Sequence, residues 1–375
     1  MVRNHRWMLD NRGLSGTCRT PSCAPPLVIV PPNSTPSAHG PALRSRLKLA
    51  LAWALGFALL GWLLSRTPWA LLSQAVQRPT AWIWCLTLAG LLLSYGLRGA
   101  RLQVVLDLDE HHQAPRRWLG LRTDALRVIL LHNAAVNLLP MRAGELSFPW
   151  LASRELNLPV SRAVVCLVWM RLQDLAVLAG LGLALWPGLP FVWRILGLAA
   201  LILGWHGGWW LLRRWLARPS AHSSATPSPA DQGWRGMAAK LQAALLEPAH
   251  HRPMAWVLTL ANWSLKLAAG ATLLSAISQT AWPVAWAGAL GGELAAIFPL
   301  QGPAGFGTYE AGVWAGMAAL LPQGSEALSH AVGAALALHV CFLICAVGAA
   351  GLAALLSGPI GLRRAQEGLP PRHPG

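Results

Sequence analysis

The chain has 375 residues, of which 54% are hydrophobic and only 12% are charged, and its mean hydropathy is +0.44. Soluble domains carry about twice that share of charged residues, so this composition excludes a soluble globular protein and predicts an integral membrane protein. The formal net charge of +16 would favour nucleic acid binding in a soluble chain, but in a membrane protein the position of each charge matters more than the sum.

The first forty residues differ from the rest of the chain. They are rich in Pro, Ser and Arg and hold one short apolar run, Leu27–Val30. That run is shorter than the apolar region of a signal peptide, which takes about 7–15 residues. We expect residues 1–46 to form a disordered basic cytoplasmic tail, with a mis-assigned start codon as the alternative.

Six apolar segments are long enough to cross a bilayer, which takes about 20 residues of helix. They are Leu47–Leu64, Ala81–Leu97, Ala163–Trp186, Phe191–Leu212, Met254–Ser278 and Ala327–Leu356. Residues 47–356 are therefore predicted to form one transmembrane domain. Its two halves are joined by a cytoplasmic linker at 213–252, and residues 357–375 form a short cytoplasmic tail.

Two further apolar segments are interrupted by Pro and Gly before they reach spanning length. The first pair, Ala125–Leu139 and Leu146–Leu156, flanks Pro140–Glu145, and the second pair, Ala285–Phe298 and Ala311–Leu321, flanks Pro299–Glu310. Paired, interrupted segments in the two halves of a membrane protein indicate a transporter's binding site. Irregular backbone at membrane depth is tolerated only beside protein or a water-filled cavity. We therefore expect two re-entrant helical hairpins around a polar cavity.

The distribution of Lys and Arg predicts how the chain is oriented. If both hairpins dip into the membrane and return on the same side, one face receives 25 of the 30 basic residues. The positive-inside rule places that face, and with it both termini, in the cytoplasm. Two crossings precede the first hairpin and five precede the second, so the hairpins enter from opposite faces. Such opposed insertion is typical of an inverted-topology repeat.

Charged residues within apolar segments are costly and usually face a cavity or a partner. The carboxylates are Glu145, Asp174, Glu293 and Glu310, and the cations are Arg142, Arg171 and Lys266. Arg171 and Asp174 are three residues apart on one helix face, which favours an internal ion pair. Glu293 could pair with Lys266, in either a structural or a functional role. In contrast, His206, His330 and His339 are predicted to be core or interface residues.

Glu145 and Glu310 each precede a helix beside broken backbone. They either cap that helix and meet its positive end, or they belong to a site where helix N-termini and Arg142 hold a phosphate headgroup. Gly305 and Gly307 permit the positive φ angles that a sharp turn before Glu310 needs.

Three motifs in order, Asn137–Glu145, Arg171–Asp174 and Pro299–Glu310, resemble the lysylphosphatidylglycerol synthase transmembrane-region family of flippase-like membrane domains. The resemblance covers nearly all of the chain. It implies movement of a lipid, often charged or glycosylated, between leaflets of a bacterial-type inner (plasma) membrane. Bifunctional members continue into a cytosolic aminoacyl-transferase domain. We expect no such activity here, because the chain ends at Gly375. Members also often carry a basic residue shortly after the first Gly-Glu, and Leu146–Pro149 has none.

We therefore expect an all-α polytopic membrane protein with about six full transmembrane helices and two oppositely inserted re-entrant hairpins. The expected function is that of a lipid flippase or scramblase-like transporter for an anionic or isoprenoid-linked lipid. The residues expected to contact that lipid are Pro140, Arg142, Gly144, Glu145, Arg171, Asp174, Lys266, Glu293, Pro299, Gly305, Gly307 and Glu310.

The partner we expect is a membrane lipid, with no nucleic acid, no metal and no cofactor; a second copy of the chain or a lipid-biosynthesis protein is a further candidate. No Gly-x-x-x-x-Gly-Lys-Ser/Thr motif occurs, so we expect no ATP hydrolysis. Two alternatives stay open. One is a membrane-embedded lipid glycosyl- or acyl-transferase that uses the same carboxylates as acid and base. The other is a non-transporting subunit of a lipid or envelope synthesis complex.

Overall fold

The computed structural model describes residues 69–108, 117–118, 120–216, 240–297 and 303–355. The first predicted crossing, Leu47–Leu64, lies outside the described residues, as do most of both predicted tails and Pro299 in the second broken loop.

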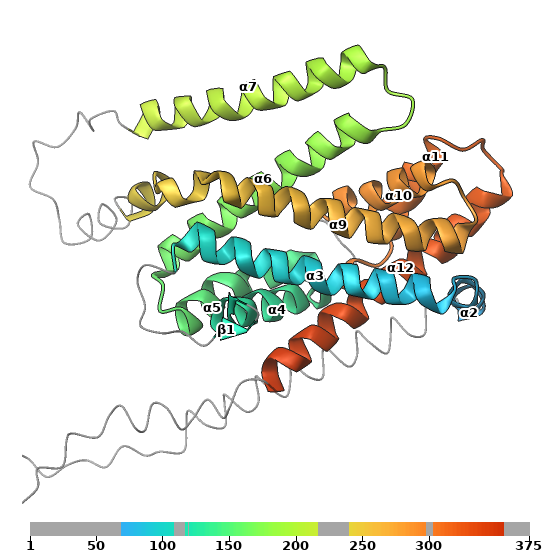
Figure 1. The fold of residues 1–375 in the computed structure, drawn as a ribbon, viewed down its shortest axis with the longest axis horizontal. Coiled ribbons are helices and arrows are strands. Elements are labelled where there is room, and N and C mark those ends of the chain that lie inside the picture. Colours follow the sequence, from blue (N-terminus) through green and yellow to red (C-terminus); the bar gives the residue numbers. More distant parts are fainter. Residues whose placement is uncertain (1–68, 109–116, 119, 217–239, 298–302, 356–375) are drawn as a thin grey trace, which may run out of the picture. The chain divides into compact units, whose positions relative to one another are not determined.

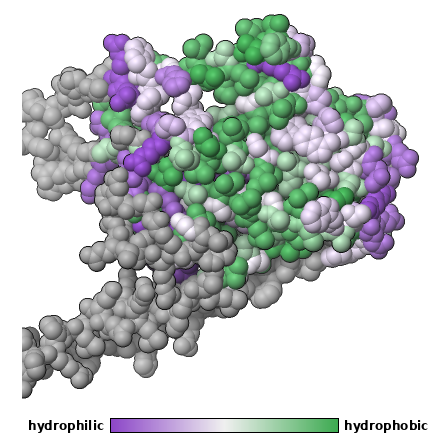
Figure 2. All heavy atoms as spheres, in the orientation of Figure 1, coloured by the Kyte–Doolittle hydropathy of each residue, from purple (hydrophilic) through white to green (hydrophobic). Residues whose placement is uncertain are grey.

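Five helices in the described residues are long and apolar enough to cross a membrane (Figure 1). They are α3 (Ala81–Leu106), α6 (Val160–Leu185), α7 (Phe191–Leu216), α9 (Pro253–Ser278) and α12 (Glu326–Leu355). Each corresponds to one of the predicted crossings, and the predicted all-α polytopic membrane fold is confirmed. Figure 2 shows hydrophobic residues across the middle of the visible face, with hydrophilic residues gathered toward opposite edges.

Short elements connect these helices. Helix α2 (Trp69–Gln77) precedes α3, and a 3-10 turn, η2 (Pro248–His251), precedes α9. The two-residue strands β1 (Arg117–Trp118) and β2 (Leu121–Arg122) pair antiparallel before the first hairpin.

Both predicted helix breaks are present, close to the expected residues. The first hairpin consists of α4 (Thr123–Leu138), the 3-10 segment η1 (Pro140–Leu146) and α5 (Ser147–Glu155); the second consists of α10 (Trp282–Ala295), η3 (Pro303–Gly305) and α11 (Thr308–Ala318). The two arms of each hairpin pack against each other, and η1 contacts η3. The two breaks, more than 150 residues apart in the sequence, therefore meet in the fold.

Glycine shapes the two breaks in different ways. At the first, Gly144 lies so close to the backbone of Ala135 that any Cβ would collide with it. At the second, the backbone takes positive φ angles at Ala304 (53°), Gly305 (81°) and Gly307 (82°). Residues with a side chain rarely adopt such angles.

The arms of the second hairpin touch through their backbones. Gly291 of α10 lies against the carbonyl oxygen of Gly312 in α11, and Gly316 of α11 lies against the carbonyl of Ala287. A Cβ at Gly291 or Gly316 would collide with the opposite backbone. Small residues allow this close helix approach inside membranes. The largest apolar cluster surrounds this hairpin and draws on α3, α9 and α12.

Helix α7 lies at the edge of the described bundle, next to α6 (Figure 1). None of its residues is buried. It is joined to the bundle by an aromatic cluster, in which the Trp209 ring lies 5.3 Å from Trp169 of α6 and 3.9 Å from His251 of η2. Lipid is therefore the environment expected for most of its surface.

The structure corrects the predicted end of the second crossing. Helix α3 continues past Leu97 to Leu106, so Arg98 and Arg101 lie inside the helix and not in the following loop. Two of the basic residues counted for the cytoplasmic face therefore belong to a span. The helix continues because Leu102 and Leu106 still pack in an apolar cluster, while other spans supply polar partners for both arginines.

Candidate functional site

A polar cavity of about 130 Å³ lies between the two hairpins. The last turns of α4 supply part of the wall, and η3 with the start of α11 supplies another part. The end of α10 and the spans α3, α6, α9 and α12 complete it. Its lining residues are Arg98, Asn133, Val136, Asn137, Arg171, Asp174, Trp263, Lys266, Glu293, Ala296, Ile297, Ala304, Gly305, Thr308, Tyr309, His339 and Phe342.

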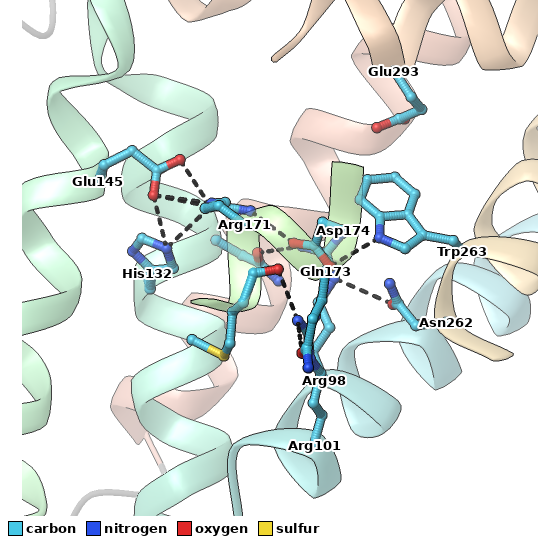
Figure 3. Close-up of polar contacts among 12 residues, drawn as sticks. Arg98, Arg101, His132, Glu145, Arg171, Gln173, Asp174, Asn262, Trp263 and Glu293 are labelled. Carbon is cyan, nitrogen blue, oxygen red and sulfur yellow. Dashed lines mark hydrogen bonds and ion pairs between the residues drawn. The ribbon is translucent and has the colours of Figure 1, made fainter. Parts of the chain in front are cut away.

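Asp174 on α6 is the anion at the centre of the ionic cluster (Figure 3). Its Oδ1 accepts hydrogen bonds from Arg101 Nη1 at 2.5 Å and from Trp263 Nε1 at 3.0 Å. Its Oδ2 lies 3.4 Å from Arg171 Nη1, which confirms the predicted Arg171–Asp174 ion pair. A carboxylate buried this deeply is stable as an ion only because cations and donors surround it.

Glu145, in η1, is bound mainly by Arg171. Nη2 of that arginine lies 2.8 Å from Glu145 Oε1, and Arg171 Nε donates to Oε2 at 3.2 Å. The His132 ring stands beside this pair, with Nδ1 3.0 Å from Ser147 Oγ. Figure 3 shows the three side chains of Glu145, Arg171 and His132 converging. Glu145 directly precedes Leu146, the N-cap residue of α5, and its capping role stays a prediction.

Arg98 on α3 is a cation held by neutral partners. Its Nη1 donates to Asn133 Oδ1 at 2.9 Å and its Nε donates to Asn262 Oδ1 at 3.2 Å. The guanidinium also lies over the Trp263 ring, 5.3 Å from its centroid. Within the described residues, no carboxylate lies within ion-pair distance of Arg98. Arg98 is therefore a cavity cation that forms no ion pair in the described part of the chain.

Lys266 on α9 and Glu293 on α10 form the predicted ion pair, with Nζ 2.6 Å from Oε2. The ammonium also faces two aromatic rings, Trp263 at 5.2 Å and Phe342 at 4.9 Å. The second carboxylate oxygen, Glu293 Oε1, has no hydrogen-bond partner in the described part of the chain, and neither does the Tyr309 hydroxyl. Buried polar atoms are normally bonded, so each such atom calls for a physical explanation.

Glu310 caps the second hairpin's outgoing helix, as one of the two alternatives predicted. Its Oε2 accepts a hydrogen bond from the backbone N–H of Gly307 at 2.7 Å. Its Oε1 lies 2.7 Å from His339 Nδ1 on α12. The His339 ring also packs against Phe306 and Tyr309. His339 was predicted to be a core or interface residue; it is buried, bonds Glu310 and lines the cavity.

The structure brings most of the predicted site residues together. Arg171, Asp174, Lys266, Glu293 and Gly305 line the cavity. Glu145 and Glu310 do not line the cavity themselves, but each bonds a residue that does: Glu145 bonds Arg171, and Glu310 bonds His339. Gly144 and Gly307 shape the two breaks. Pro140 and Arg142 belong to η1, but the structure describes only their backbone, and Pro299 lies outside the described residues.

The lining residues that sequence reasoning missed include Arg98, Asn133, Trp263, Tyr309 and His339. A signal was present for two of them. Arg98 and Arg101 stand three residues apart, as neighbours on one helix face do. Asn133 and Asn137 are a polar pair four residues apart in an apolar segment, and Asn137 Nδ2 donates to the Asn133 carbonyl at 2.7 Å.

A separate polar cluster joins the ends of α3 and α9 away from the cavity. Arg252 donates to both oxygens of Asp107, at 2.7 Å each. His250 in η2 is fully buried, and this burial lowers its pKa to about 4 although nearby Glu247 acts in the opposite direction. In the described residues no three His, Cys, Asp or Glu side chains gather as a metal site would need.

Comparison with known families gives one match. The family model of the lysylphosphatidylglycerol synthase TM region matches residues 47–357. No curated protein and no solved structure matches the chain. The matched range contains all the described helices, both breaks and the cavity between them. This chain is therefore a multi-pass membrane protein that belongs to the lysylphosphatidylglycerol synthase transmembrane-region family.

Proposed function

We propose that the protein is a flippase or scramblase-like transporter that moves an anionic or isoprenoid-linked lipid between the two leaflets. The observation that carries the proposal is Arg98, a cavity cation with no carboxylate partner in the described residues. A charge within a membrane span is costly unless it faces a partner or a cavity. An anionic phosphate headgroup in the cavity would supply the missing negative charge.

The charges of the lining support the same conclusion. Three lining residues are cations and two are carboxylates. Arg101 and Glu145, which lie just behind the lining, offset each other. Glu310 is bonded to a helix N-terminus and to His339. The lining thus favours a ligand that carries negative charge, while the apolar tails of a lipid would remain in the bilayer.

The two breaks offer a route for such a headgroup. Because η1 contacts η3, and the end of α4 and η3 line the cavity, a small movement of either hairpin would open the cavity toward one side. In this proposal both termini lie in the cytoplasm of a bacterial-type inner membrane, and the first hairpin faces the cytoplasm.

We further propose that the protein is not an enzyme. A general acid or base must exchange a proton with its substrate. Asp174 and Glu145 are held by arginines, and Glu310 caps a helix. These bonds suit a rigid binding site better than proton transfer, which favours transport over the transferase alternative.

Purified protein in liposomes tests the proposal. We expect a fluorescent anionic lipid to reach the other leaflet without ATP, measured as the fraction protected from a membrane-impermeant quencher. Arg98→Gln should slow this movement roughly tenfold or more, because a charged hydrogen bond to the headgroup is lost. Arg78→Gln is the matched control, since Arg78 bonds the Ile277 carbonyl and does not line the cavity.

Two results would contradict the proposal. In the first, lipid movement would be no faster with protein than in empty liposomes. In the second, the protein would consume an activated donor and release a modified lipid, which would establish the transferase alternative.

A further inference from the structure

We infer that the last turns of α7 bind the phosphate of an anionic phospholipid, at a site separate from the cavity. The contact is made by two consecutive arginines, Arg213 and Arg214, at the level of the lipid headgroups. This inference does not depend on the proposed function, because a lipid that stabilises the structure can bind there whether or not the protein moves lipids.

The length of α7 sets the depth of these arginines in the bilayer. Its 26 residues rise about 1.5 Å each and so span about 39 Å, whereas the hydrocarbon core of a bilayer is about 30 Å thick. A helix centred in the bilayer therefore leaves its final residues, from about Arg213 onward, among the headgroups. Trp210 and Trp215 are 54% and 66% exposed beside them, as interfacial aromatic residues are. The phosphate layer is therefore the surface that this end of α7 meets.

Both arginines are exposed, and each lies over a tryptophan ring. The Arg213 guanidinium is 5.3 Å from the centroid of Trp209, and the Arg214 guanidinium is 4.8 Å from the centroid of Trp210. Among the described residues neither arginine donates a hydrogen bond or lies within ion-pair distance of a carboxylate. The rings therefore hold two cations whose N–H groups stay available. A guanidinium binds phosphate oxygens through paired N–H donors, so charge and geometry both fit a phosphate.

The arginine at the opposite end of α7 is bonded in a different way. Arg194 donates through Nε and both Nη nitrogens to backbone carbonyls between the end of α6 and the start of α7, at distances of 2.7–3.0 Å. These bonds use its donors to close the connection between the two helices. Arg213 and Arg214, in contrast, leave two positive charges and their donors at the surface.

A lipid bound here would stabilise the attachment of α7 to its neighbours. The Trp209 ring, which lies under Arg213, is 5.3 Å from the Trp169 ring of α6 and 3.9 Å from the His251 ring of η2. A phosphate that fixes Arg213 therefore also fixes Trp209 in this aromatic cluster. A ligand that binds only the folded state raises its stability, so the lipid should protect the contact between α7 and η2.

The test counts the lipids bound to the purified full chain. Protein in neutral detergent would be titrated with phosphatidylglycerol, which is anionic, or with phosphatidylcholine, which is zwitterionic, and bound lipids would be counted by native mass spectrometry. Phosphatidylglycerol should raise the melting temperature of the wild-type protein more than phosphatidylcholine does. Arg213→Gln/Arg214→Gln should weaken binding at this site about tenfold or more, because each basic residue at the lipid surface contributes severalfold to the affinity.

Three further variants assign the effect to the two arginines. Arg213→Lys/Arg214→Lys keeps both charges but loses the paired N–H donors, so its affinity should lie between those of the wild type and the glutamine variant. Arg154→Gln removes a single exposed arginine that also lies over a tryptophan, Trp150, and should leave the number of bound lipids unchanged. Arg98→Gln changes the cavity and should retain the lipid at α7.

Unchanged phosphatidylglycerol binding in the glutamine variant would overturn the inference. So would full affinity in the lysine variant, which would show a general attraction to positive charge, or equally strong competition by inorganic phosphate, which would identify a free anion as the ligand. Asp231, which lies outside the described residues, is the first acid after the two arginines in the sequence. Tighter lipid binding in Asp231→Asn would show that this carboxylate, and not a lipid, is their partner. A lipid retained at α7 without lipid movement in liposomes would reject the proposed function alone.

Discussion

The two hairpins share a helix–break–helix design, yet their glutamates bond to different kinds of partner. Glu145 of the first break binds Arg171, 26 residues later in the chain. Glu310 of the second contacts His339, 29 residues later. In both halves the partner lies on the first long helix after the hairpin, α6 or α12. The repeat therefore extends beyond the breaks to the position of the basic side chain that binds each glutamate.

The difference lies in the chemistry of that partner. The Arg171 guanidinium can donate to both oxygens of a carboxylate, whereas the His339 ring contacts Glu310 through one nitrogen. Glu145 contacts both Arg171 and His132 and is linked through Arg171 to Asp174, while Glu310 also accepts a backbone N–H. We conclude that similar motifs determine the backbone path of both hairpins, and that the rest of the fold determines their electrostatics.

The strongest test of this contrast removes the basic partner from each hairpin. Arg171→Met should lower the free energy of unfolding by about 3–5 kcal/mol, since it leaves Glu145 without its arginine and deprives Asp174 of one. His339→Gln should cost only about 1 kcal/mol, because Glu310 keeps its backbone donor. Thermal unfolding in detergent measures both, with Arg171→Lys as the control that retains the charge. Equal losses at the two positions would mean that the hairpins are held in the same way.

A second test compares the glycines of the two breaks. Gly144→Ala and Gly307→Ala should each lower the free energy of unfolding by about 1–3 kcal/mol. At Gly144 the added methyl group overpacks against the backbone, and at Gly307 alanine must adopt an unfavourable φ of 82°. Leu should be much less stable than Ala at Gly144, which touches Ala135. It should be little less stable than Ala at Gly307, where no atom of the described residues, apart from the adjoining ones, lies within 4 Å of the position that a Cβ would take. Denaturant titrations of the four variants check this. The same size dependence at both positions would contradict the distinction.

The smallest expected effect is at the cap itself. Glu310→Gln should cost about 0.5–1 kcal/mol, because the amide oxygen still accepts the Gly307 N–H. Glu145→Gln should cost more, since it weakens the neutralisation of Arg171. Unfolding midpoints of the two variants, measured side by side, give the comparison. A larger loss for Glu310→Gln would show that the cap, and not the ionic cluster, is the stronger attachment.

The sequence predicted the breaks and the ion pairs of α6 and α9–α10, and physical reasons explain why. Pro and Gly interrupt helices locally, and the spans hold so few charges that Lys266 and Glu293 had few alternative partners. The end of α3 was predicted wrongly because Arg98 and Arg101 read as the start of a loop. Their partners Asn133 and Asp174 are 35 and 73 residues away, and only the tertiary fold brings them near. His339 gave no spacing signal, because its neighbours in α12 from Ala331 to Cys345 are apolar.

The backbone contact between α10 and α11 also limits how the second hairpin can move. Sliding one arm along the other would carry Cβ atoms of neighbouring residues into the positions now held by Gly291 and Gly316, where a Cβ collides with backbone. Packed helices that shift by small shear steps need side chains that can change rotamer at the interface. At the closest contacts between α10 and α11, Gly291 and Gly316 have no side chain that could change rotamer. The second hairpin should therefore move as a rigid body. Any opening of the cavity on that side then requires hinge rotation at the two ends of the hairpin.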